Sequence, residues 1–140
     1  MTAAGAIVHA LRALNTTKIG FASPYVDAIN ELAVAFFAET GIETVERAGI
    51  SRDLGNYDQG QLTPDEVYEL GLQANGPDVE AVVLSCTDMR SVEIVDRLEA
   101  KLNKPVVTSN QAMLFQALRQ LEMDVDEVRC GCLFRKLRLI

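Results

Sequence analysis

The sequence predicts an α/β fold in which a parallel sheet carries helices on both faces, as in flavodoxin-like domains. Helix-type and strand-type segments alternate along most of the chain, which is the pattern of strands joined by crossover helices. Residues 81–85, AVVLS, form a continuous apolar run, as expected for a strand covered on both faces. Hydrophobic residues make up 49% of the 140 residues, enough for a core without disulfides or metals. With no linker or internal repeat, residues 1–140 are predicted to form a single domain.

The first half of the chain is predicted to hold two helices and two strands before a long loop. The stretch KIGFAS is short and apolar, and Pro24 ends it. The stretch DAINELAVAFFAET is strongly helical, and Gly41 provides a suitable C-terminal stop. In chain order, we expect a helix over 3–14, a strand over Lys18–Ser23, a helix over 27–40, a strand over 42–47 and a polar loop over 49–60.

The second half continues the alternation, beginning with a helix whose start is marked by a capping box. Thr63 can cap this helix, Pro64 suits its first position, and Glu66 can reach back to the cap. A later segment has apolar residues at three- and four-residue spacing, namely Val92, Val95, Leu98 and Leu102. In chain order, we expect a helix over 63–75, a strand over 81–85, a helix over 91–102, a strand over 105–108, a helix over 111–121 and a strand with a basic end over 125–140.

The predicted sheet indicates one edge as the place for a functional site. Ligands of open α/β sheets bind beyond the carboxyl ends of the strands. Right-handed crossovers between parallel strands bring those ends to the same edge. Four loops follow predicted strands and are the candidates, at residues 24–25, 49–56, 86–88 and 109–110.

Cys86 is the strongest candidate for a reactive residue. It follows the apolar strand directly and precedes a predicted helix, whose amide dipoles would favour the thiolate over the thiol. A thiolate can act as a nucleophile or move a proton at a carbon next to a carboxylate. Arg90 either supports the thiolate or is simply solvated. A buried, unreactive cysteine is an equally good interpretation of the position alone.

Other polar residues in these loops have a binding interpretation and a structural one. Tyr25, at the end of the first strand, could donate a hydrogen bond to a substrate carboxylate or could cover the core. Asn56 could hold a carboxylate or serve as a turn residue. Ser109 and Asn110 could contact a ligand or cap the next helix. Local evidence favours the structural interpretation for all four.

Charge and hydropathy exclude several classes of function. The formal net charge is −7, which argues against binding to nucleic acids and to anionic lipid surfaces. A small anionic substrate remains compatible with this charge, because backbone amides can hold a carboxylate. No apolar run approaches the length of a membrane span, and the N-terminus lacks the pattern of a signal peptide. The chain is therefore expected to act in the cytoplasm, away from membranes.

The cysteines and the histidine do not suggest a metal site. Three cysteines are present, an odd number that is consistent with a reduced, cytoplasmic protein. Cys130 and Cys132 form a C-x-C pair, which is too few ligands for structural zinc, and His9 lies far away in sequence. Glycine-rich nucleotide motifs are absent. We expect neither a metal nor an organic cofactor.

Three segments together resemble the C-terminal half of the maleate isomerase and arylmalonate decarboxylase group, within the aspartate/glutamate racemase superfamily. The segments are AIVHALRALNTTKIGFASPYVDAIN, AVVLSCTDMRSVEIVDRLEAKLNKP and PVVTSNQAMLFQALR. The resemblance implies two similar α/β halves that face each other, with the active site between them. It also implies that Cys86 is the catalytic cysteine of this half. Tyr25, Asn56 and the backbone amide of Thr87 would hold the substrate carboxylates.

The resemblance further implies cofactor-independent cysteine chemistry on a small carboxylate or dicarboxylate. Isomerisation of maleate is our first expectation, and racemisation or decarboxylation of an arylmalonate type is the alternative. Because members of the group are about twice as long, a homo-oligomer could rebuild a two-cysteine site from two copies of Cys86. Two other interpretations stay open: a carboxylate-binding half-domain without catalysis, and a plain α/β domain with an inert Cys86.

Overall fold

A computed structural model describes residues 1–123 and 129–139 of the chain. Its centre is a four-stranded sheet with the order β2-β1-β3-β4, and every neighbouring pair of strands is parallel. This is the strand order of flavodoxin-like folds, so the predicted fold class is confirmed. The strands are β1 (Lys18–Ser23), β2 (Glu43–Gly49), β3 (Ala81–Leu84) and β4 (Val106–Thr108).

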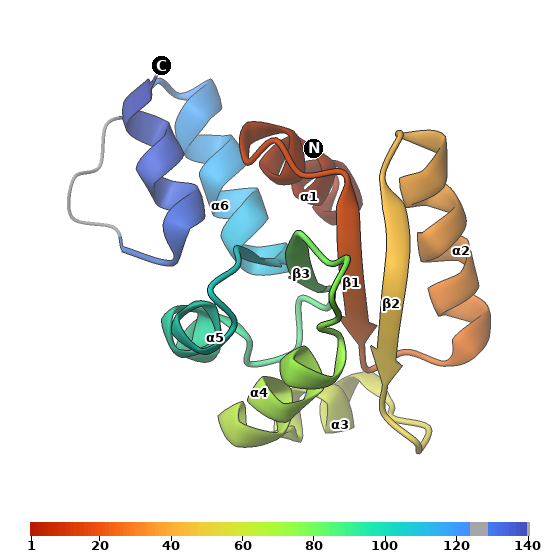
Figure 1. Cartoon of the computed structure of the whole chain (residues 1–140). Helices are drawn as coiled ribbons and strands as arrows, with labels where there is room; N and C mark the ends of the chain where they lie inside the picture. Colours follow the sequence, from red (N-terminus) through yellow and green to blue (C-terminus); the bar gives the residue numbers. More distant parts are fainter. Residues whose placement is uncertain (124–128, 140) are drawn as a thin grey trace.

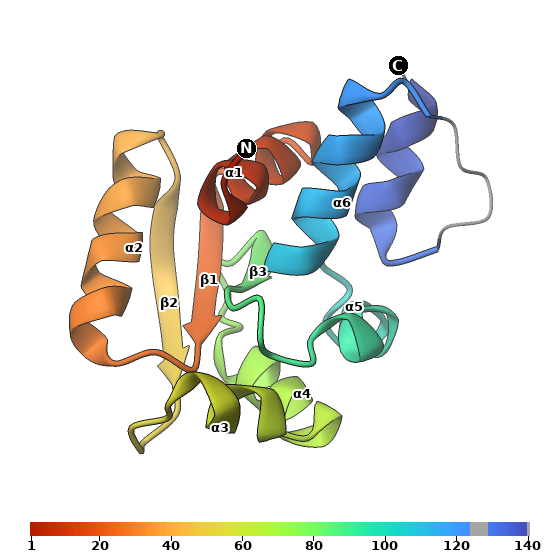
Figure 2. The same ribbon diagram turned by 180° about the vertical axis from the view of Figure 1, so that it is seen from behind.

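Helices cover both faces of this sheet (Figures 1 and 2). On one face α1 and α6 lie side by side, and α2 lies beside β2; on the other face α4 and α5 pack against the strands. None of the helices in the described part of the chain has the length and apolar character of a membrane span. The helices are α1 (Ala3–Ala13), α2 (Asp27–Glu39), α3 (Asn56–Gln61), α4 (Pro64–Gln73), α5 (Val95–Leu102) and α6 (Ser109–Gln120), with 3-10 turns η1 (Val92–Ile94) and η2 (Cys132–Leu139).

The core follows from the alternation of side chains along the buried strands. Phe21 and Val83 belong to the cluster under α1 and α6, whereas Val82 and Leu84 belong to the cluster under α4 and α5. All four are fully buried, as the continuous apolar run of β3 predicts for a strand covered on both faces. Cys86 shares the α4/α5 side with Leu84.

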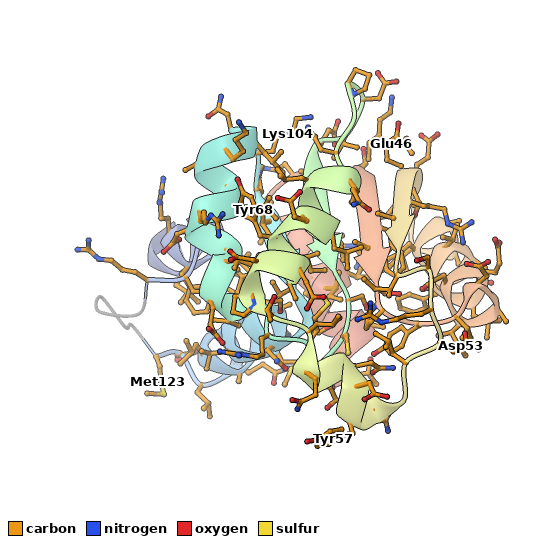
Figure 3. The ribbon with its side chains drawn as sticks, turned by 90° about the horizontal axis from the view of Figure 1, so that it is seen from below. Glu46, Asp53, Tyr57, Tyr68, Lys104 and Met123 are labelled. Carbon is orange, nitrogen blue, oxygen red and sulfur yellow. The ribbon has the colours of Figure 1, made fainter. Side chains whose placement is uncertain are left out.

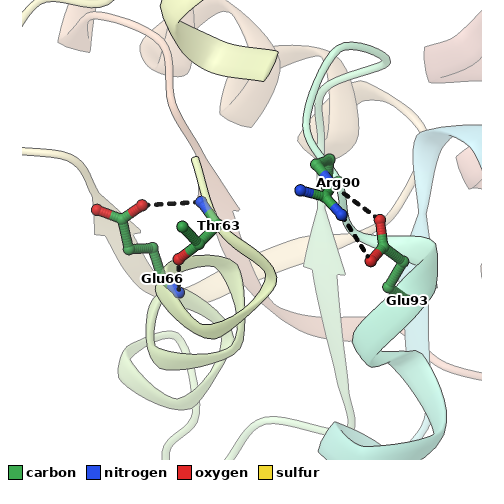
Figure 4. A network of polar contacts seen from close by, with 4 residues as sticks. All are labelled: Thr63, Glu66, Arg90 and Glu93. Carbon is green, nitrogen blue, oxygen red and sulfur yellow. Dashed lines mark hydrogen bonds and ion pairs between the residues drawn. The ribbon is translucent and has the colours of Figure 1, made fainter. Parts of the chain in front are cut away.

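Capping boxes fix the starts of two helices at the edge where the strands end. The Thr63 hydroxyl accepts from the Glu66 amide and the Glu66 carboxylate accepts from the Thr63 amide (Figure 4), which confirms the predicted box. Thr108 and Gln111 form a second box at the start of α6. Because Thr108 is the cap, α6 begins earlier than the predicted residue 111.

Two predicted segments differ in the structure. The polar loop predicted over 49–60 ends in a helix, α3, which places Gln59 in the protein interior. The final segment is predicted as a strand over 125–140, but residues 132–139 form η2. Its apolar residues Leu133, Phe134 and Leu137 pack on the cluster under α1 and α6, and Leu137 follows the other two at helical spacings of four and three residues. Residues 124–128 and 140 lie outside the described residues.

Gly20, near the middle of β1, lets α4 approach the sheet closely. A Cβ atom at this position would lie 1.8 Å from the carbonyl oxygen of Ala74. Ala74 is the C-cap of α4 and is fully buried. The absence of a side chain on Gly20 is therefore a condition for the packing of α4.

Candidate active site

The residues predicted for the site lie at the edge of the sheet where the strands end. Tyr25 follows β1, Cys86 and Thr87 follow β3, and Asn56 is the first residue of α3. This short helix lies beyond the end of β1, beside the start of α4 (Figure 2). Figure 3 views the molecule from this end and shows Tyr57 of α3 pointing outward. Helix α3 therefore covers part of the carboxyl edge of the sheet.

The structure brings Cys86 and Tyr25 together. Cys86 is only 1% exposed. Tyr25 packs against the buried cluster that contains Cys86, and the sulfur lies close enough to raise the pKa of the Tyr25 phenol. On the other side, the thiol donates to Oε1 of Gln59 at 3.5 Å. Asn56 and Thr87 are exposed at the same edge, and within the described residues neither is hydrogen-bonded to the sulfur.

Two features could support a thiolate at Cys86, namely the start of the following helix and Arg90. The helix predicted over 91–102 begins at Val92 with the 3-10 turn η1 and continues as α5, so a turn separates Cys86 from the helix start. The Arg90 guanidinium makes two hydrogen bonds to the Glu93 carboxylate, at 2.8 and 3.0 Å (Figure 4). Arg90 is thus engaged on the surface, in agreement with the solvated interpretation of this residue.

Tyr25 is held as a neutral phenol. Burial raises the pKa of Tyr25 well above its usual range, and the adjacent Cys86 sulfur raises it further through a hydrogen bond and its charge. The Asp88 carboxylate acts in the same direction. Tyr25 therefore keeps its proton at neutral pH and can donate a hydrogen bond to a carboxylate.

A buried asparagine on α2 fixes the loop that carries Tyr25. The Ser23 hydroxyl donates to Oδ1 of Asn30, and Nδ2 of Asn30 donates to the Tyr25 carbonyl at 3.1 Å. The Tyr25 amide in turn donates to the Ser23 hydroxyl oxygen at 3.2 Å. Asn30 is 5% exposed, so these bonds are shielded from water and define one conformation of the loop.

Two further amide side chains hold the neighbouring loops in the same way. Nδ2 of Asn110 donates to the Thr87 carbonyl at 3.0 Å, which ties the loop after β3 to α6. Nε2 of Gln59 donates to the Leu54 carbonyl at 3.1 Å, which ties the loop after β2 to α3. The predicted role of Asn110 as the cap of α6 is wrong, because Thr108 is the cap. Its side chain is engaged with the Thr87 carbonyl.

Sequence reasoning did not find Asn30 or Gln59. Asn30 carried a usable signal, because it is a polar residue on the inward face of the apolar helix DAINELAVAFFAE. Gln59 gave none, because it lies in a polar stretch that matched a loop. Its importance depends on contact with Cys86, which is remote in sequence.

A separate cavity of about 320 Å³ lies between α2 and β2. None of the four predicted site residues lines it. Asn30 does, so this residue separates the cavity from the Tyr25 loop. The lining residues are Phe21, Asp27, Asn30, Glu31, Arg47, Ala48 and Gly49.

The C-x-C pair lies away from the site and is tied to α5 and α6. Gln111 donates to the Cys130 carbonyl, and the Glu99 carboxylate accepts from the Cys132 amide at 2.9 Å. Burial first, and then the Asp96 and Glu99 carboxylates, raise the pKa of Cys130 to about 11. Burial and Glu99 raise the pKa of Cys132 to about 12. In the described part of the chain no group of three or more His, Cys, Asp or Glu side chains could hold a metal ion.

These raised thiol pKa values predict a loss of stability in alkali. Unfolded thiols ionise near pH ~8.5, whereas the folded thiols of Cys130 and Cys132 stay protonated up to about 11 and 12. Their stabilising contribution is therefore complete below pH ~8.5 and is lost as pH rises toward these folded values. We expect the Tm of the wild type under reducing conditions to fall more steeply between pH 8 and 10.5 than that of a Cys130→Ser/Cys132→Ser variant. Parallel curves of Tm against pH would contradict this expectation.

Comparison with known proteins identifies the family. Residues 1–134 match the sequence model of the family described as arylmalonate decarboxylase. The chain belongs to the arylmalonate decarboxylase family. The predicted resemblance is thereby confirmed, since this match spans nearly the whole chain.

Individual known proteins are similar to this chain in sequence and in structure. The chain is 31% identical over 129 residues to a maleate isomerase of Pseudomonas putida, covering 89% of this chain and 50% of that one. It is 28% identical over 123 residues to an arylmalonate decarboxylase of Bordetella bronchiseptica, covering 84% and 50%. A solved structure of a Nocardia farcinica maleate cis-trans isomerase mutant superposes with a TM-score of 0.88 at 25% identity, covering 99% and 55%.

Two facts about these members bear on function. The solved Nocardia mutant holds a covalently bound succinylcysteine intermediate, so a cysteine is catalytic in that protein. The present chain spans about half the length of the curated relatives it matches. A role in the chemistry of small dicarboxylates, as isomerase or decarboxylase, is thus supported for the family to which this chain belongs.

Proposed function

We propose that this chain provides a catalytic half-site for the cofactor-independent isomerisation of a small dicarboxylate, of the maleate cis-trans type, with Cys86 as its catalytic residue. The observation that carries the proposal is the contact of the buried Cys86 sulfur with Tyr25 at the carboxyl edge of the sheet. A relative of nearly the same fold carries a succinylcysteine intermediate, which supports cysteine chemistry at such an edge.

The residues at this edge suit the binding of a carboxylate. Tyr25 is a neutral donor, Thr87 offers a backbone amide at the exposed turn after Cys86, and Asn56 offers a side-chain amide. All three are uncharged donors, so they can hold an anion without a cation in a chain of net charge −7. The second carboxylate of the substrate would lie on the open side of the site.

The proposed reaction forms and breaks one carbon–sulfur bond. Cys86 first gives its proton to water and regains one after the reaction. Its thiolate adds through the sulfur to one alkene carbon of maleate, and the π electrons move into the adjacent carboxylate. The former double bond is then single and rotates. Return of the electrons expels the thiolate and leaves fumarate, with no net change in protons or electrons.

A second function of the same family is favoured by one specific contact. In decarboxylation or racemisation, a cysteine gives a proton to an enediolate carbon, so it must start as a thiol. The hydrogen bond from the Cys86 thiol to Gln59 suits that role. A carboxylate-binding half-domain without catalysis is the remaining alternative.

The other half of a complete site could come from a second copy of this chain. We propose a homodimer in which two Cys86 residues face one another, because the family's two halves are expected to be alike. Light scattering coupled to size exclusion tests this pairing, and a mass near 15.3 kDa would contradict it.

Alkylation of Cys86 in the presence and absence of maleate tests the proposed site. We expect iodoacetamide to modify Cys86, as identified by mass spectrometry, and saturating maleate to slow that modification severalfold. Cys130 and Cys132 serve as internal controls, because their raised pKa values keep them slow and maleate should not change their rates. The product then identifies the reaction: fumarate indicates isomerisation, a racemised acid indicates racemisation, and carbon dioxide indicates decarboxylation. A Cys86 that maleate does not protect would contradict the proposed function.

A further inference from the structure

The orientation of the Gln59 side-chain amide is fixed by its hydrogen bond to the Leu54 carbonyl, in the loop that precedes α3. The Leu54 carbonyl is only an acceptor, so the Gln59 atom at 3.1 Å from it must be the nitrogen Nε2. The other end of the amide, Oε1, therefore faces the Cys86 sulfur at 3.5 Å. Gln59 is 5% exposed and Cys86 is 1% exposed, so water does not compete for these contacts.

An amide oxygen in this orientation discriminates between the two forms of the sulfur. A thiol donates its proton to Oε1, whereas a thiolate would place a negative charge against the negative end of the amide dipole. Rotating the amide of Gln59 would point its NH₂ at the sulfur, but it would also set Oε1 against the Leu54 carbonyl. With a thiolate at Cys86, the present orientation of Gln59 loses the hydrogen bond to the sulfur, and the rotated one loses the hydrogen bond to Leu54. Either loss of a buried hydrogen bond costs free energy.

One neighbouring group works against this preference. Tyr25 lies beside the sulfur as a neutral phenol, and its hydroxyl could donate a hydrogen bond to a thiolate. Asp88, on the same loop as Cys86, is an exposed carboxylate that raises the pKa of Tyr25, and it would likewise oppose a negative charge on the sulfur. Arg90 is paired with Glu93, and Asn110 of α6 is a neutral side chain directed to Thr87.

We infer that Gln59 is a positioning residue that holds Cys86 as a protonated thiol in the unliganded chain. This inference rests on the proposed function, because it assigns a role in preparing the catalytic cysteine. A protonating reaction can use this thiol directly. An addition to maleate requires Gln59 to release the sulfur first.

Two substitutions of Gln59 are expected to move the pH profile of Cys86 alkylation in opposite directions. Gln59→Glu places a carboxylate beside the sulfur and should slow the reaction roughly tenfold at pH 7.5, with the profile moved to higher pH. Gln59→Met has a similar shape but no amide oxygen, so it should speed the reaction severalfold and move the profile to lower pH. Gln61→Glu, an exposed residue of the same helix, is the matched control and should leave the profile unchanged.

The opposite signs separate this role from a merely structural one. If Gln59 only anchored α3, both variants would loosen the helix and speed alkylation at every pH without moving the profile. Profiles that do not move, or that move in the same direction, would overturn the inference. If maleate still protects Cys86 in that case, the proposed function survives while the role of Gln59 does not.

An infrared measurement of the Cys86 S–H band tests the inference without the Gln59 variants, which could fold poorly. The S–H stretching band of Cys86, obtained as the difference between wild type and Cys86→Ala, should be present at pH 8 and shifted as for a thiol bonded to a carbonyl. Absence of the band, or a position typical of a free thiol, would also overturn the inference. This result does not depend on whether Cys86 is catalytic.

Discussion

Gly20→Ala is expected to destabilise the folded chain strongly, because the added methyl group would clash with the end of α4 where it packs on β1. The new methyl carbon would lie 1.8 Å from the Ala74 carbonyl oxygen and 2.9 Å from its carbonyl carbon. Both are backbone atoms at the end of α4, so no side-chain rotation can relieve the overlap. Overpacking a core costs about 1–3 kcal/mol and sometimes more, and this site belongs at the upper end. Thermal unfolding followed by circular dichroism should show a Tm lower by about 10 °C or more.

A second glycine in the sheet provides the control. Gly49 ends β2, and a Cβ atom there would meet nothing within 4 Å. Gly49→Ala should leave the stability within about 0.5 kcal/mol of the wild type. Equal Tm values for the two alanine variants would show that α4 moves away from β1 at little cost, contrary to this expectation.

Asn30→Ala is expected to reduce both stability and ligand protection. The substitution removes the acceptor of the Ser23 hydroxyl and the donor to the Tyr25 carbonyl. Each buried polar group left without a partner costs about 1–3 kcal/mol, so the free energy of unfolding should fall by roughly 2–4 kcal/mol. Because the Tyr25 loop would lose its fixed conformation, maleate should protect Cys86 from alkylation less strongly. Urea unfolding and the alkylation assay measure the two effects.

Variants of the same helix distinguish positioning from folding in this case. Asn30→Asp keeps the acceptor for Ser23 but sets a buried carboxylate against the Tyr25 carbonyl, so it should be at least as destabilising as Asn30→Ala. Glu39→Ala, at an exposed position of α2, should change neither quantity. If Asn30→Ala lowers stability while maleate protection is fully retained below its Tm, Asn30 does not position Tyr25.

Local signals were sufficient to predict most of the fold. β1 was predicted with its observed ends because a short apolar run meets Pro24, which cannot continue a central strand. The start of α4 was predicted because Thr63 and Glu66 satisfy each other over three residues. The end of the chain was not predictable in this way. Leu133 and Phe134 form part of η2 because α1 and α6 are there to receive them.

The positions of the candidate site residues were predicted in outline, but their contacts were not. Cys86 and Tyr25 lie near one another because each follows a predicted strand, and parallel strands bring their ends together. The partner of Cys86 on α3, Gln59, depends on a contact between residues 27 positions apart. The helix after Cys86 begins within one residue of its predicted start, and Glu93 binds the Arg90 guanidinium, which agrees with the solvated interpretation of Arg90.

The three amide contacts that hold the site loops consist only of uncharged groups. Asn30, Gln59 and Asn110 neither gain nor lose a proton in the working range of pH, and added salt does not screen a bond between neutral dipoles as it screens an ion pair. The nearby ion pairs, Arg52–Glu66 and Arg90–Glu93, are exposed and contribute little. The shape of the site should thus persist across buffers of different ionic strength. A change in substrate affinity with pH or salt would then reflect the charge of the substrate or of Cys86, and not a change in the conformation of the loops.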